Sequence, residues 1–155
     1  DLLKDSKKIS FKKRQEISEH IKSNSFYAIG LATVDEILDL NILQASLLSM
    51  KRALEKLNVK PNLILIDGNF APSGLKNCKT IINGDEKIKV ISAASIIAKV
   101  YRDNLMIKLA EEFSYYSWES NFGYGTKAHL EGLKKFGITS HHRKGFKPVH
   151  KILSN

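Results

Sequence analysis

One short segment restricts the fold more than any other: four apolar residues, 63–66, that end at an aspartate, Asp67. A run of this length predicts a strand buried on both faces, as in a parallel sheet. Because helical patterns flank this strand, the sequence indicates an α/β architecture. An aspartate at the carboxyl end of such a strand stands where open α/β sheets bind ligands. Asp67 therefore either takes part in chemistry or only begins the turn at Gly68 and Asn69.

Hydrophobic periodicity gives the remaining elements. The clearest amphipathic stripe lies within residues 43–57, where apolar side chains recur every three or four residues after a start at Asp39 or Asn41. We expect Ser10 to cap the first helix and Gly137 to follow the last one. The predicted helices cover residues 10–22, 41–57, 92–113 and 126–136, the predicted strands cover 26–34, 63–66 and 79–82, and an irregular basic tail covers 140–151.

Size and composition limit the class of protein. A chain of 155 residues with 43% hydrophobic residues is expected to form one domain, residues 1–155, with a real core. No apolar run approaches the roughly 20 residues that cross a bilayer. The single cysteine, Cys78, excludes an internal disulfide and fits a reducing compartment. We therefore expect a cytoplasmic monomer without a membrane partner.

The charge is uneven along the chain. The formal net charge is +9, and residues 132–155 carry six basic and no acidic side chains. Basic ends around a neutral middle indicate a partner made of phosphates, such as a nucleic acid. A lysine-rich surface that only keeps the protein in solution is the alternative.

Two acidic sites could bind a metal ion. Asp67 and Asp85 are 18 residues apart and both follow predicted strands, so their oxygens could share hard cations such as Mg²⁺ or Mn²⁺. Two such ions would activate water against a phosphodiester. From spacing alone, the explanation of each aspartate as a turn residue is somewhat favoured. The pair at 35–36, an Asp and a Glu, more simply stabilises a helix start.

Four further clusters could contact phosphate or a sugar. Each also has a structural explanation: a helix approach, a helix cap with exposed charges, a turn with a packed tyrosine, or a loose tail. The candidates are Lys7 and Lys8 in DSKKIS, Ser92, Ser95 and Lys99 in SAASIIAKVYRD, Tyr124 in FGYGT, and His141 and Arg143 in HHRKGFKP.

Taken together and in this order, these motifs resemble the bacterial ribonuclease HII family. The segments that carry the resemblance are DSKKIS, DEILDLNILQASLLSM, LILIDGN, INGDEKIKVISAASIIAKVYRD and GYGTKAHLEGLKKFGITSHHRKGFKPV. The resemblance implies a ribonuclease H-like α/β fold: a mixed sheet flanked by helices, with a helical C-terminal segment. It also implies an endonuclease that cuts RNA in RNA–DNA hybrids and single ribonucleotides embedded in duplex DNA.

The resemblance also assigns residues. Asp67 and Asp85 match two of four family carboxylates that bind two divalent ions, Mn²⁺ or Mg²⁺, for two-metal hydrolysis. Tyr124 matches the tyrosine that packs on the sugar beside the ribonucleotide. The other candidates lie in matching motifs near the substrate backbone: Lys7, Lys8, Ser92, Ser95, Lys99, His141 and Arg143.

The chain departs from the family pattern at its start. In the family, an Asp-Glu pair and a Gly-Arg-Gly loop precede DSKK, whereas only Asp1 to Lys4 do so here. We therefore expect an N-terminally incomplete enzyme with little or no nuclease activity as written. The alternative function is that of a non-catalytic nucleic-acid-binding fragment.

Overall fold

A computed structural model describes residues 9–154 of the chain. These residues form two compact units: unit 1 contains 9–31 and 46–100, and unit 2 contains 32–45 and 101–154. Helices α2 (Val34–Glu55) and α4 (Lys89–Glu112) each contribute to both units.

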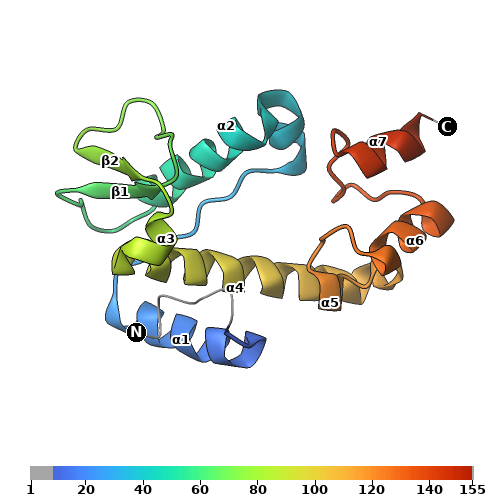
Figure 1. Cartoon of the computed structure of the whole chain (residues 1–155), viewed down its shortest axis with the longest axis horizontal. Coiled ribbons are helices and arrows are strands. Elements are labelled where there is room, and N and C mark those ends of the chain that lie inside the picture. The colour runs from blue at the N-terminus through green and yellow to red at the C-terminus, as the bar shows by residue number, and fades with distance from the viewer. Residues whose placement is uncertain (1–8, 155) are drawn as a thin grey trace. The chain divides into compact units, whose positions relative to one another are not determined.

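Unit 1 contains a small parallel sheet. Strands β1 (Ile64–Asp67) and β2 (Cys78–Ile81) lie side by side (Figure 1) and pair in register, so that Asp67 stands opposite Ile81. The sequence placed both strands to within one residue. The expectation of burial on both faces was wrong, because only Ile66 of β1 is buried and Leu63 is 48% exposed. Within residues 9–154 the sheet has these two strands.

Helices complete unit 1. The first is α1 (Phe11–Asn24), and the Ser10 hydroxyl accepts a hydrogen bond from Lys13 N at 3.3 Å, which confirms the predicted cap. The short helix α3 (Gly84–Lys87) follows β2 and leads directly into α4. The buried apolar side chains of this unit are Ile66, Ile91, Ile96, Ile97 and Val100.

The predicted strand at 26–34 is wrong, because residues 26–33 form an extended segment that pairs with no strand. Side chains from the end of α2 and from the residue after it bind its carbonyl oxygens: Arg52 donates to Leu31 O at 2.8 Å and Lys56 donates to Ile29 O at 3.3 Å. A Cβ at Gly30 would overlap the carbonyl oxygen of Ser49. The segment therefore lies directly on the α2 backbone, a close approach that glycine permits.

Helix α2 is interrupted at Asn41, whose φ of 69° and ψ of 167° are not helical. The Asn41 side chain accepts hydrogen bonds from the amides of Leu43 and Gln44 at 3.0 and 3.1 Å, so it caps the following segment as predicted. Thr33 and Glu36 form a capping box before the first segment, with bonds of 2.8 and 3.1 Å. Glu36 therefore has the helix-start role that the sequence favoured.

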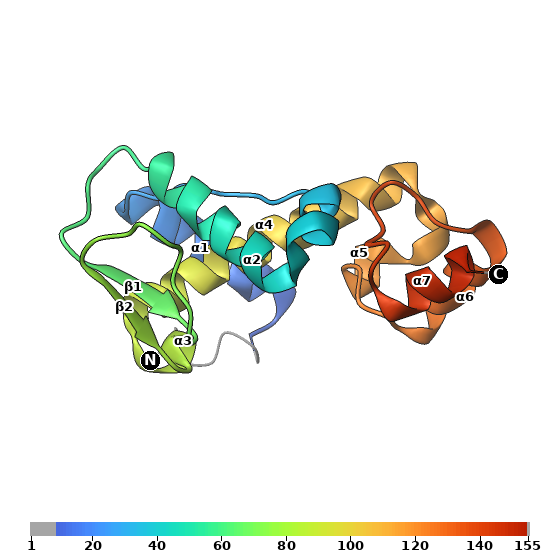
Figure 2. The same ribbon diagram turned by 90° about the horizontal axis from the view of Figure 1, so that it is seen from above.

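Unit 2 is built from short helices around an aromatic core. It contains the 3₁₀ turn η1 (Ser114–Tyr116), α5 (Trp118–Asn121), α6 (Lys127–Phe136) and α7 (Lys147–Leu153), with α6 beside α7 (Figure 2). The expectation of an irregular tail over 140–151 was wrong in part, since α7 buries Val149 in this core. The core side chains are Met106, Ala110, Tyr116, Trp118, Leu133 and Val149.

The boundaries of α6 follow the sequence. Thr126 caps its start by accepting from His129 N at 3.4 Å, and Gly137 ends it with a φ of 76°. Among residues 9–154, no helix combines the length and the apolar content that crossing a bilayer requires.

Candidate functional site

Asp67 is joined to the segment that carries Asp85. Oδ1 of Asp67 accepts a hydrogen bond of 2.7 Å from the backbone N–H of Gly84, and Asp85 is the next residue, in the first turn of α3. Asp67 is exposed and Asp85 is half-buried. The structure thus brings the two segments together at the carboxyl edge of the parallel strands, where α/β sheets bind ligands.

The turn that makes this approach uses two special backbone positions. Asn83 adopts a left-handed conformation, with φ 54° and ψ 43°, and reverses the chain after β2. At Gly84, an added Cβ would lie 2.7 Å from Ile91 Cδ1 and 3.4 Å from Asp67 Oδ1. A residue without a side chain therefore lets the main chain reach the carboxylate.

The donor atoms at this edge suit a hard divalent cation. Carboxylate oxygens are the ligands that Mg²⁺ and Mn²⁺ prefer, and both Asp67 and Asp85 supply them. Among residues 9–154, no group of three or more His, Cys, Asp or Glu side chains is arranged to hold a metal ion. At this edge of the sheet, the described part of the chain therefore offers Asp67 and Asp85 as candidate ligands, where the sequence resemblance implies four carboxylates, and their role as ligands stays a prediction.

The polar candidates on α4 share one face of the helix. Ser92, Ser95 and Lys99 are spaced by three and four residues, so they follow one another along the same side. The sequence suggested that Ser92 caps a helix. In the structure Ser92 instead lies inside the first turns of α4, where its amide donates to Ile88 O at 2.9 Å. It is 2% exposed, whereas Ser95 and Lys99 are half-buried. Lys7 and Lys8 lie outside the described residues.

In unit 2, the main chain of Tyr124 is fixed while its ring is exposed. The Tyr124 amide donates to Asn121 O at 2.9 Å, and its carbonyl accepts from Thr126 N at 2.8 Å and from His129 Nδ1 at 2.9 Å. The side chain is 66% exposed. A packed tyrosine, the explanation favoured for the isolated motif, is therefore wrong.

Two arginines accompany this tyrosine. Nη2 of Arg102 lies 3.1 Å from the position that a Cβ would take at Gly123, and Arg102 interacts electrostatically with Tyr124 and Arg143. Partial burial, and then the charge of Arg143, lower the pKa of Arg102. Arg102 thus interacts with the exposed Tyr124 and with a second cation, Arg143, and such a set of groups suits a phosphate and an adjoining sugar or base.

The loop 139–143 is folded rather than loose. The exposed His141 ring packs edge-on against Phe113, with centroids 5.4 Å apart. Arg143 is exposed, and its carbonyl accepts from Phe146 N at 2.9 Å. His142 between them is 4% exposed, and its Nδ1 accepts from Thr139 N at 2.9 Å.

Sequence reasoning missed two residues here, His129 and His142. Their rings meet inside the aromatic core, with Nε2 atoms 3.2 Å apart, and Trp118 donates to His129 at 3.1 Å. His129 follows Tyr124 in the motif GYGTKAH and His142 precedes Arg143, so each stands near a predicted contact residue. Their positions were visible in the sequence, but the bond between them required the fold.

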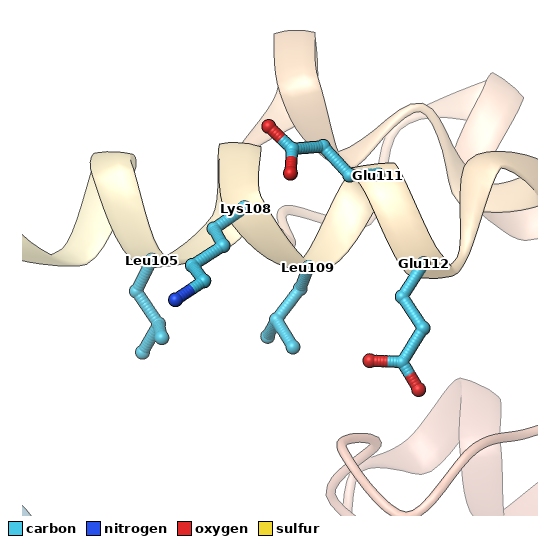
Figure 3. A pocket seen from close by; sticks show the side chains of 5 residues that line it. All are labelled: Leu105, Lys108, Leu109, Glu111 and Glu112. Atoms are coloured by element: carbon cyan, nitrogen blue, oxygen red, sulfur yellow. The ribbon is translucent and has the colours of Figure 1, made fainter.

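A surface depression on α4 is separate from these groups (Figure 3). Leu105, Lys108, Leu109 and Glu112 project from one side of the helix and Glu111 from the other. All five lining residues come from one helix, so the depression is an open helix face. No predicted site residue lines it.

The fold agrees with a solved nuclease. The crystal structure of the ribonuclease H2 from Pyrococcus horikoshii OT3 superimposes with a TM-score of 0.75 at 25% identity, over 98% of this chain and 80% of that one. The protein thus has the ribonuclease H-like α/β fold that the sequence implied.

Sequence comparison names the family. The ribonuclease HII profile matches residues 2–150, and the ribonuclease HII of Pelagibacter ubique is 56% identical over 98% of this chain and 82% of its own length. The Macrococcus caseolyticus ribonuclease HII is 49% identical over 97% of this chain and 57% of its own length. The chain belongs to the ribonuclease HII family, whose members are metal-dependent type 2 ribonuclease H endonucleases.

Proposed function

We propose that this protein serves to cleave the RNA strand of RNA–DNA hybrids and single ribonucleotides in duplex DNA. The observation that carries the proposal is the bond between Asp67 and Gly84, because it joins the two acidic segments at one edge of the sheet. Membership of the ribonuclease HII family supplies the reaction class.

Asp67 and Asp85 are the residues that would hold divalent ions, Mn²⁺ or Mg²⁺. Two bound ions in such a site activate a water and stabilise the leaving oxygen of a phosphodiester. The protein's own part is to fix the carboxylates: the Gly84 amide orients Asp67, and the first turn of α3 presents Asp85.

Substrate recognition falls to the cationic and aromatic groups. We assign phosphate contacts to Lys7, Lys8, Ser92, Ser95, Lys99, His141 and Arg143, and the sugar beside the ribonucleotide to Tyr124. Its exposed ring and the neighbouring Arg102 and Arg143 support the assignment. Discrimination of RNA from DNA requires contact with the 2′-hydroxyl.

The carboxylate count limits the activity expected of the 155-residue chain alone. Two carboxylates neutralise two divalent cations only in part, so we expect little or no cleavage although nucleic acid is bound. The test incubates the chain with Mn²⁺ and a duplex that contains one ribonucleotide, and measures cleavage by electrophoresis and affinity by fluorescence anisotropy. Salt-sensitive binding without cleavage fits the proposal, and efficient metal-dependent cleavage contradicts the limit on activity.

A non-catalytic nucleic-acid-binding role is the second candidate, favoured by the six basic and no acidic side chains of residues 132–155. Under that role, Mn²⁺ has no effect on affinity for the duplex, whereas the nuclease site requires Mn²⁺ and duplex to bind together. Titration of the duplex with and without Mn²⁺ separates the two.

The organisation of the molecule completes the proposal. The family match runs through both units without a break, which supports one ribonuclease H-like domain. The single Cys78 supports a reducing compartment, the cytoplasm. We expect a monomer, which sedimentation analysis measures directly.

A further inference from the structure

A chain of hydrogen bonds runs through the core of unit 2 between two loops. At one end, His142 Nδ1 lies 2.9 Å from Thr139 N and 3.0 Å from Thr139 Oγ1. In the middle, His142 Nε2 lies 3.2 Å from His129 Nε2, which also receives the Trp118 indole N–H at 3.1 Å. At the other end, His129 Nδ1 lies 2.9 Å from the Tyr124 carbonyl oxygen.

The partners at the two ends determine where the protons are. The Tyr124 carbonyl can only accept, so His129 carries its proton on Nδ1 and its Nε2 is an acceptor. The Thr139 amide can only donate, so His142 Nδ1 is an acceptor and its proton is on Nε2. His142 therefore donates to His129, and both rings are neutral. His129 Nε2 thus accepts from two donors, Trp118 and His142, which share its one lone pair.

The hydrogen-bonded side chains are buried from solvent. Exposed fractions are 1% for Trp118, 6% for His129 and 4% for His142. The Tyr116 ring stacks on Trp118 at 4.9 Å and meets the His142 ring edge-on at 4.8 Å. Buried polar groups that have hydrogen-bond partners favour one geometry, because another arrangement would leave a donor or acceptor unpaired.

We propose that His129 and His142 are positioning residues for substrate recognition. Their buried hydrogen bonds fix the position of the Tyr124 main chain relative to the 139–143 loop. Tyr124 and Arg143 then meet the same duplex together. The inference rests on the proposed function, since it needs Tyr124 to contact nucleic acid. Both histidines are buried within the core, so their role is to position other groups rather than to touch the reacting atoms.

Two substitutions at position 129 separate the effect of the hydrogen bond to Tyr124 from that of the bonds to Trp118 and His142. In His129→Asn, the side-chain amide takes the place of Nδ1 and still donates to Tyr124 O. In His129→Gln, the longer amide takes the place of Nε2, so it still accepts from Trp118 and His142 but leaves Tyr124 unsupported. The exposed His20, in unit 1, provides the matched control His20→Gln.

The assay measures a preference: the ratio of dissociation constants for an all-DNA duplex and for the same duplex with one ribonucleotide, at one salt concentration. We expect Tyr124→Ala and His129→Gln each to lower this ratio about tenfold, or about 1.4 kcal/mol. Their combination should lower it no further, since both act through one side chain. His129→Asn and His20→Gln should keep the ratio within about twofold.

Three results have distinct meanings. If Tyr124→Ala lowers the ratio and a folded His129→Gln protein does not, the positioning role is wrong and the proposed function stands. Equal loss in His129→Asn and His129→Gln also overturns it, because that result indicates a merely structural histidine. If Tyr124→Ala itself has no effect, the assigned sugar contact fails and the positioning role fails with it.

Nuclear magnetic resonance tests the hydrogen bonds of His129 and His142 in the protein without any ligand. The ¹⁵N shifts of the imidazoles should show His129 protonated on Nδ1 and His142 on Nε2. Since Trp118 is the single tryptophan, one indole N–H signal reports its bond to His129. That signal should shift in His129→Asn and stay near its place in His129→Gln. The opposite tautomers would overturn the proposal whatever the binding data show.

Discussion

The carboxylate of Asp67 and the main chain of Gly84 are joined by a hydrogen bond of 2.7 Å across 17 residues of sequence. The acceptor is charged when Asp67 is ionised, which makes such a bond shorter and stronger than a neutral one. The bond ties the end of β1 to the start of α3. Any change at Asp67 therefore alters both a charge and a structural contact, and the two effects can be separated by choice of substitution.

Asp67→Asn should remove the charge and keep the contact, because the amide oxygen still accepts from Gly84 N–H. We expect Mn²⁺ affinity, measured by calorimetry, to fall at least about tenfold with little change in thermal stability. Asp67→Ala removes both and leaves the buried amide unpaired, which should cost about 1–3 kcal/mol of unfolding free energy. Unaltered Mn²⁺ binding in Asp67→Asn would contradict the ligand assignment.

Gly84→Ala should destabilise the protein by about 1–3 kcal/mol, because the new Cβ would lie 2.7 Å from Ile91 Cδ1. Ile91→Val deletes that Cδ1 atom and alone should cost about 0.5–1.5 kcal/mol. The double variant should therefore be less destabilised than the sum of the two changes, as measured by urea unfolding. Strict additivity would show that the crowding lies elsewhere in the turn.

Lowering the pH should destabilise the folded state through His142. Burial first, and then the electrostatic repulsion that a charged His142 would meet from His129 and His141, lower its pKa from 6.5 to about 4. Between pH 6.5 and about 4, His142 is protonated in the unfolded protein and neutral in the folded one. The free energy of unfolding therefore decreases by about 1.4 kcal/mol for each unit by which the pH is lowered. The total loss on acidification to about pH 4 is about 3 kcal/mol.

The control for this pH effect is His142→Asn. Its amide oxygen can still accept from Thr139 N–H, but it does not titrate. The other ionisable groups around the ring, His129, His141 and Tyr116, are the same in both proteins. Denaturant unfolding from pH 7 to pH 4 should therefore give a steeper fall for the natural protein, and parallel curves would refute the role of His142.

Salt dependence should reveal the two arginines. If Arg102 and Arg143 each neutralise one phosphate, Arg102→Gln and Arg143→Gln should each reduce the slope of log affinity against log salt by about 1. Lys51→Gln, on the exposed side of α2, serves as the control and should leave the slope unchanged. The measurement is anisotropy with one duplex at several salt concentrations. Unchanged slopes for both arginine variants would exclude them as phosphate contacts.

The sequence predicted those helix boundaries that are set by neighbouring residues. The cap at Ser10, the helix restart at Asn41 and the stop at Gly137 were readable because each is decided within a few residues. Residues 26–33 were misread as a strand because their composition fits one. Their carbonyls are bonded by Arg52 and Lys56, contacts more than twenty residues away that no local pattern reveals.

The same distinction applies to the candidate site. Asp67 and Asp85 could be singled out because each follows a predicted short strand, and motif resemblance added Tyr124 and Arg143. The pairing of His129 with His142 depends on two loops folding onto one core, so neither residue differed in sequence from an ordinary surface histidine. Arg102 gained meaning only when the fold placed it beside Gly123.

The ring of Tyr124 projects from a main chain whose polar groups already have partners before any nucleic acid arrives. Engagement therefore requires no refolding of that loop and little further loss of backbone entropy. Association should be fast, limited by diffusion and by ionic strength rather than by a conformational step. Variants that loosen the loop would then slow capture of the duplex as well as shorten its residence.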